Sequence, residues 1–239
     1  MDLGRWLRIA VPALVIGAAG AFAVARSVIT IPGSGECPPG TVHAGKGPPD
    51  GDAVWCEEPE GHVKHGPYHE WTVTGVKVAE GRYEHGKKQG LWTTYWWNGA
   101  KWEQGPYRDG VREGPWKSWY DTGEVADAGE YHANKPEGHW VGWHRNGRKA
   151  DEGDFHEGMT EGPWIGWHEN GQKSQEGAFR RDQPHGHFVW WYPNGRKQME
   201  GDYLDGMKVG RWIEWDESGH KTSEKTYREG VEAKPSDSL

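Results

Sequence analysis

The chain has 239 residues, a hydrophobic content of 34% and 17 tryptophans beside only 4 phenylalanines. A hydrophobic content this low argues against a conventional globular core, while the many regularly placed aromatic residues argue against a disordered chain. The net charge of −8, with a sequence pI near 5.9, argues against generic nucleic-acid binding, which usually shows a basic face.

Residues 9–25 form an uncharged apolar run of 17 residues, preceded by Arg5 and Arg8 and followed by Arg26. The run fits a signal peptide, and it fits a membrane anchor, although it is slightly short for a hydrocarbon core of about 30 Å. We therefore expect one N-terminal hydrophobic helix within residues 1–30, either cleaved or kept. Both alternatives export the rest of the chain to the periplasm or the extracellular space, and the second anchors it in the inner membrane through residues 9–25.

Residues 31–60 are rich in glycine and proline and contain both cysteines of the chain, Cys37 and Cys56. Two close cysteines in an exported protein are expected to pair as a disulfide, which closes this segment. Closure of a loop of this length stabilises a fold by about 3 kcal/mol in the chain-entropy model.

Residues 61–230 contain a repeat of 24 residues without insertion or deletion. Each unit begins with a glycine, which we count as position 0 and which recurs at Gly66, Gly90, Gly114, Gly138, Gly162, Gly186 and Gly210. Aromatic residues stand at positions 2, 5 and 17 of every unit, glycine at position 9, and lysine at position 11 of six units.

Four units carry Asn-Gly at positions 8 and 9, as in Asn170-Gly171. Asn-Gly between strand-like runs predicts a two-residue type I′ hairpin turn. Counting outward from that turn pairs Trp164 with Gly177, Gly162 with Phe179, and Trp167 with Ser174.

Each large ring is therefore expected to cover the bare backbone of a glycine on the neighbouring strand. The residues that we expect to hold the repeat together in this way are Trp92, Trp116, Trp140, Trp164 and Trp212, with Gly105, Gly129, Gly153, Gly177 and Gly201. A single hairpin is only marginally stable, so the units should pair edge to edge. The expected fold class is all-β: an elongated single-layer antiparallel β-meander of seven 24-residue hairpin repeats, preceded by the hydrophobic helix. Residues 231–239 are expected to form a disordered tail.

The phrase G-x-W-x-x-W-x-x-N-G-x-K-x-x-E-G-x-Y-x-x-G, read from residue 66 to about residue 230, resembles the MORN-repeat variant of the bacterial YwqK-like "antitoxin" family. The resemblance implies a β-hairpin meander that serves as a binding scaffold, without catalytic residues, and the family label implies a toxin partner. Val125 and Ala128 depart from the phrase in the third unit, and Lys225 replaces the position-15 glycine of the seventh. A terminal unit often differs because it caps the stack.

The residues with catalytic or metal-binding chemistry form no familiar site. The densest histidine group, His62, His65 and His69, has no cysteine or carboxylate at a known ligand spacing. A row of glutamates at position 14 of five units indicates a structural ladder rather than a glycosidase pair: Glu80, Glu152, Glu176, Glu200 and Glu224. The same counting places the position-11 lysines on the opposite face. We expect no enzyme activity and no cofactor, because nucleophile and nucleotide-binding motifs are missing from the sequence.

Some aromatic residues exceed what the repeat requires, and we take them as candidate ligand-binding residues: Trp96, Trp97, Trp102, Trp190, Trp191 and Tyr192. Exposed tryptophan and tyrosine suit protein interfaces and also stack on sugar rings. The predicted function is a non-catalytic, exported repeat scaffold that binds another envelope protein through its aromatic-rich sheet. Two alternatives stay open, a glycan or cell-wall binding module and an antitoxin or immunity protein.

Overall fold

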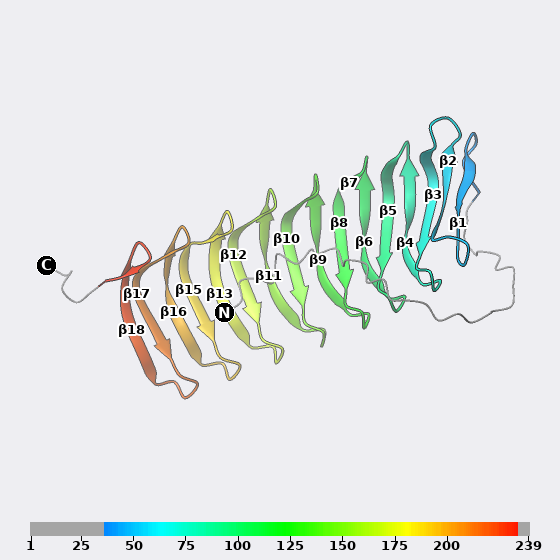
Figure 1. Ribbon diagram of the computed structural model, residues 1–239. Helices are drawn as coiled ribbons and strands as arrows, with labels where there is room; N and C mark the ends of the chain where they lie inside the picture. The colour runs from blue at the N-terminus through cyan, green and yellow to red at the C-terminus, as the bar shows by residue number, and fades with distance from the viewer. Residues whose placement is uncertain (1–35, 234–239) are drawn as a thin grey trace. The chain divides into compact units, whose positions relative to one another are not determined.

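The computed structural model describes residues 36–233, whose strands form one antiparallel sheet of 19 strands. The strands pair in chain order, from β1 at one edge to β18 near the other (Figure 1), where the short β19 pairs with β18. β7 and β8 both pair with β6, and β14 and β15 both pair with β13. The strands are β1 (Val42–Lys46), β2 (Ala53–Glu58), β3 (Val63–Trp71), β4 (Lys77–Glu84), β5 (Lys87–Tyr95), β6 (Lys101–Arg108), β7 (Val111–Arg112), β8 (Gly114–Trp119), β9 (Val125–His132), β10 (Lys135–Trp143), β11 (Lys149–His156), β12 (Met159–Trp167), β13 (Lys173–Arg180), β14 (Gln183–Pro184), β15 (Gly186–Trp191), β16 (Lys197–Leu204), β17 (Met207–Trp215), β18 (Lys221–Arg228) and β19 (Val231–Glu232).

The expected fold class is wrong in describing seven hairpins preceded by a helix. The sheet begins before the repeat, because β1 pairs with β2 and β2 pairs with β3. Residues 36–233 contain no helix, and thus none there that could span a membrane. The helix expected within residues 1–30 lies outside the described residues, as do residues 234–239 of the expected tail.

The two-residue turn predicted at Asn-Gly is wrong. At Asn170-Gly171 the backbone N–H of His168 bonds Gln172 O at 2.8 Å, which leaves a three-residue loop, and only Gly171 has a positive φ. The two-residue turns stand instead between successive units. Arg181 and Asp182, for example, have φ angles of 50° and 65°, and both central residues of a type I′ turn require positive φ.

The predicted pairing of Trp164 with Gly177 and of Gly162 with Phe179 is nevertheless confirmed. The three-residue loop shifts the register by one residue, and a β-bulge at Ser174 shifts it back, so that Trp167 pairs with Lys173 rather than with Ser174. From Gly166 outward, the shift caused by the loop and the shift caused by the bulge cancel, so the strand residues pair as predicted.

The position-2 ring of every unit after the first lies over a position-15 glycine, as expected, but over the glycine of the preceding unit. A Cβ atom added to Gly105 would lie much closer to the Trp116 indole than van der Waals contact allows, and the same holds for Gly153 beneath Trp164. The indole N–H of Trp116 also donates to Pro106 O at 3.2 Å, beside the glycine. In the seventh unit Lys225 takes the place of this glycine, because the sequence has no eighth unit whose position-2 ring would pack on it.

The position-2 and position-17 rings alternate across one face of the sheet, which we call the ring face. Neighbouring rings meet edge to face, and centroid separations run from 4.9 Å, between Tyr203 and Trp212, to 6.3 Å, between Trp212 and Tyr227. Such pairs contribute about 0.5–1.5 kcal/mol each beyond their burial. The ladder supplies the core, because six of its position-2 rings are at most 8% exposed: Tyr68, Trp92, Trp116, Trp164, Phe188 and Trp212.

Candidate functional surface

The opposite face of the sheet, which we call the lysine face, carries the position-5 rings and the position-11 lysines. The ammonium group of Lys149 lies over the ring of Trp167, one unit further on, at 5.5 Å from the ring centroid. The same ammonium is 2.5 Å from Glu152 Oε2. The expectation that these lysines and glutamates face opposite sides is wrong, because the bulge at position 12 adds one residue between them.

The glutamate row is therefore a row of ion pairs that belongs to the sheet. Five units contain the pair, with N–O separations of 2.5–2.8 Å: Lys77–Glu80, Lys149–Glu152, Lys173–Glu176, Lys197–Glu200 and Lys221–Glu224. In the last pair the guanidinium of Arg211, followed by the ammonium of Lys221, lowers the pKa of Glu224 to about 2. The Glu224 carboxylate held ionised in this way acts as a fixed acceptor at neutral pH.

The edge formed by the three-residue turns is held by side chains that reach from one unit to the next. Asn170 Nδ2 donates to Pro193 O at 2.5 Å, and Asn170 Oδ1 accepts from the Gln172 N–H at 3.0 Å. At position 6 a polar-tipped ring bonds the next unit's position-5 carbonyl, as His144 Nε2 does to Trp167 O at 2.8 Å. This role was not predicted from the sequence, although a tryptophan, tyrosine or histidine stands at position 6 in five successive units.

The first candidate group, Trp96, Trp97 and Trp102, lies at this turn edge. Trp96 occupies position 6, and its indole N–H donates to Trp119 O at 2.8 Å. Its ring contacts Trp102 at a centroid distance of 5.2 Å. Trp97, by contrast, is 75% exposed at position 7 of the turn. Val73, at the same position of the preceding unit, is 88% exposed, so an apolar patch spans two neighbouring turns.

The second candidate group does not form one site. Trp190 lies on the ring face, where it stacks on Phe188 at 5.4 Å, while Trp191 faces the other side because strand residues alternate. The ammonium of Lys173 lies 6.0 Å from the Trp191 ring centroid, and Tyr192 Oη donates to Trp215 O at 2.9 Å. All three side chains are half-buried.

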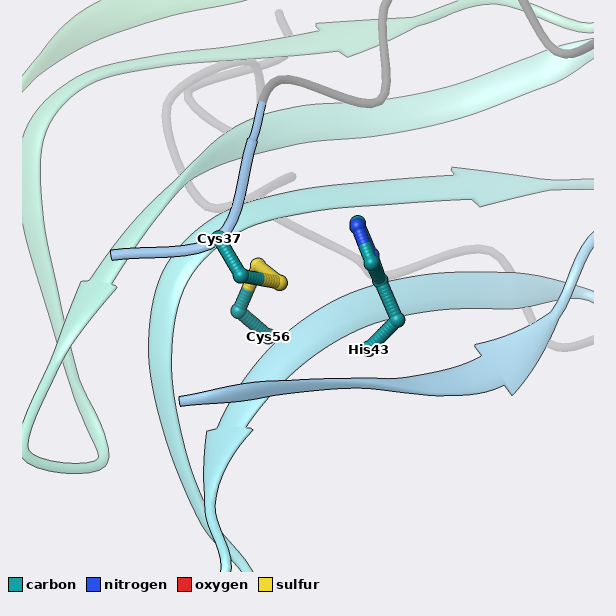
Figure 2. Close-up of side chains that lie close together, drawn as sticks. All are labelled: Cys37, His43 and Cys56. Atoms are coloured by element: carbon teal, nitrogen blue, oxygen red, sulfur yellow. A yellow bond between two sulfur atoms is a disulfide. The ribbon is translucent and has the colours of Figure 1, made fainter. Parts of the chain in front are cut away.

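Cys37 and Cys56 form the expected disulfide, with a sulfur–sulfur distance of 2.06 Å. His43 of β1 lies beside it (Figure 2), but the two sulfurs are bonded to each other and offer no thiolate to a metal. The disulfide indicates an oxidising compartment, as for exported proteins.

Two segments of the chain, residues 112–133 and 184–205, match the family model described as MORN repeat variant. Both segments begin two residues before a position-0 glycine and end at the first residue of a two-residue turn, so each covers one complete hairpin. The matches support a repeat scaffold. They do not extend to the YwqK-like antitoxin family, and no curated protein sequence matches the chain.

Proposed function

We propose that the protein is a non-catalytic repeat scaffold of an oxidising compartment outside the cytoplasm, which binds another envelope protein through its aromatic-rich sheet. The contact is centred on the patch formed by Val73 and Trp97. One observation carries the proposal: the 75% exposure of Trp97 on a turn whose geometry does not need its ring. At the same turn position the next units have Asp121, Arg145 and Glu169.

The rest of the sheet supports this choice of contact. The large rings of the ring face are packed against one another, and lysines lie over several position-5 rings of the lysine face. An exposed tryptophan held on a firm base is the kind of residue that dominates protein interfaces. The base is firm because Trp96, next in the chain, is bonded to Trp119 O and packed on Trp102.

The test compares Trp97→Ala with Glu169→Ala, a matched change at the same position of an equivalent turn. The folded, disulfide-bonded proteins are used to retain partners from the envelope fraction of the source cells. We expect Trp97→Ala to lose the retained protein while its unfolding temperature stays within a few degrees of the parent, and Glu169→Ala to keep both properties. Retention that survives Trp97→Ala would refute the proposal. Binding to a polysaccharide array that depends on Trp97 would favour the glycan-binding alternative.

A further inference from the structure

Three side chains with metal-ligating atoms converge where the non-repeat hairpin meets the first repeat. Glu58 ends β2, His65 lies in β3, and His85 stands in the two-residue turn between β4 and β5. Glu58 Oε1 is 3.1 Å from His65 Nδ1 and 2.6 Å from His85 Nδ1. All three ligand atoms lie within 4.8 Å of one another.

We propose that Glu58, His65 and His85 bind one divalent transition-metal ion, with zinc as the best fit, and that the ion ties the amino-terminal hairpin to the first repeat. Two imidazoles and one carboxylate are a ligand set that zinc accepts, with bonds of about 2.0–2.2 Å and a fourth position left for water. Ligand atoms around a tetrahedral ion of that size stand about 3.3 Å apart. The Glu58 oxygen is closer than this to both imidazole nitrogens and would move away slightly, and all three ligand atoms already lie within 4.8 Å of one another.

The other repeats show what is particular about this cluster. In four other units the residue at position −1 is a glutamate or glutamine whose side-chain oxygen accepts the backbone N–H of the two-residue turn, as Gln89 Oε1 does from Asp109 at 2.9 Å. In the first unit this acceptor is His65 Nδ1, which lies 3.4 Å from the backbone nitrogen of His85. The Nδ1 atom that accepts this N–H is unprotonated and has a single lone pair, which a bound ion would take in place of the long contact to the turn N–H. The same atom also faces the Glu58 carboxylate.

At the equivalent positions of the sixth unit, the side chains carry different charges. There Arg180, His185 and Asp205 occupy the places of Glu58, His65 and His85, and Asp205 pairs with both of the others. That cluster already contains a positive charge, the guanidinium of Arg180. The Glu58 cluster instead brings an acidic group and two imidazoles together, and a bound cation would satisfy all three.

The exposure of the three side chains suits metal entry from solvent. The His85 side chain is 72% exposed on its turn, whereas those of His65 and Glu58 are 17% and 32% exposed. Two ligands are thus held by strands, and the third can close over the ion from solvent. The ion would link two strands, β2 and β3, and one turn that the chain otherwise joins by hydrogen bonds.

The experiment titrates the full, disulfide-bonded, tag-free chain with zinc chloride by calorimetry. His65→Gln keeps an oxygen for the turn N–H, as Gln89 does, and removes the ligand. His85→Ala places alanine where Ala133 already occupies the same turn position. His132→Ala is the matched control, because His132 is an exposed histidine outside the cluster.

We expect one zinc ion per chain, with affinity at least tenfold weaker in His65→Gln and in His85→Ala and unchanged in His132→Ala. NMR of the parent should show zinc shifting the Nδ1 resonances of His65 and His85. Absence of saturable one-to-one binding, or equal affinity in all variants, would overturn the proposal. So would zinc shifts confined to other histidines.

Discussion

Replacing Gly105 by alanine tests whether the Trp116 ring packs directly on the backbone of Gly105. The added Cβ would lie much closer to the Trp116 indole than van der Waals contact allows, and the backbone that carries it belongs to β6, which is paired with a strand on each side. The indole must therefore shift or leave its seat.

The magnitude lies between two limits. Overpacking that the ring absorbs by a small shift costs about 1–3 kcal/mol. Complete expulsion of an indole that buries about 150–250 Å² costs about 4–6 kcal/mol at 25 cal/mol per Å². The lost hydrogen bond to Pro106 O would add about 1 kcal/mol. We expect Gly105→Ala to lower the free energy of unfolding by about 2–4 kcal/mol.

The assay is urea unfolding of four proteins that form a double-mutant cycle: the parent, Gly105→Ala, Trp116→Ala and the double variant. Because the clash needs the indole, Gly105→Ala should cost little in the Trp116→Ala background. Lys225→Ala is the control, since Lys225 stands at the same repeat position with no ring above it, and its change should stay within about 1 kcal/mol. Additive effects in the cycle, or a Gly105→Ala cost as small as that of Lys225→Ala, would refute the reasoning.

Two further predictions concern the edges of the sheet. Asn170→Ala removes the acceptor of the Gln172 N–H and the donor to Pro193 O, so we expect a loss of about 1–2 kcal/mol and faster hydrogen exchange at Gln172; unchanged exchange would contradict this role. The Glu137 carboxylate, 2.9 Å from His156 Nδ1, raises the pKa of His156 above its ordinary value. The associated stabilisation is therefore present below about pH 6.5 and is lost as the pH rises through the folded-state pKa. Glu137→Gln should lower the NMR titration midpoint of His156, and an unmoved midpoint would sink the assignment.

The register of the repeat could be predicted because it depends on local facts. Strand residues alternate, so a pairing such as Trp164 with Gly177 follows once a turn has been placed. The turn type was predicted wrongly, and the pairing survived because the bulge at Ser174 offsets the longer loop. The sequence of one repeat unit does not reveal that the loop and the bulge shift the strand register in opposite directions. The consequence, Lys173 and Glu176 on the same face, was therefore missed.

Other features were out of reach because they join units or lie outside the repeat. A ring seated on the glycine of the preceding unit depends on how hairpins pair with each other, which the hairpin turn does not specify. The Glu58 cluster needs the register between β2 and β3, and β2 lies outside the repeat. The two-residue turns did carry a signal, in pairs such as Asp109-Gly110 and Asp205-Gly206.

The most direct test of the fold measures the proton NMR shifts of the glycine α-protons. A proton beneath the face of an indole or phenyl ring is shielded by the ring current. The position-15 glycines, Gly81, Gly105, Gly129, Gly153, Gly177 and Gly201, should therefore resonate well upfield of the turn glycines Gly99, Gly147, Gly171 and Gly195. Ordinary shifts at all six position-15 glycines would contradict the seating of rings on glycine that holds this sheet together.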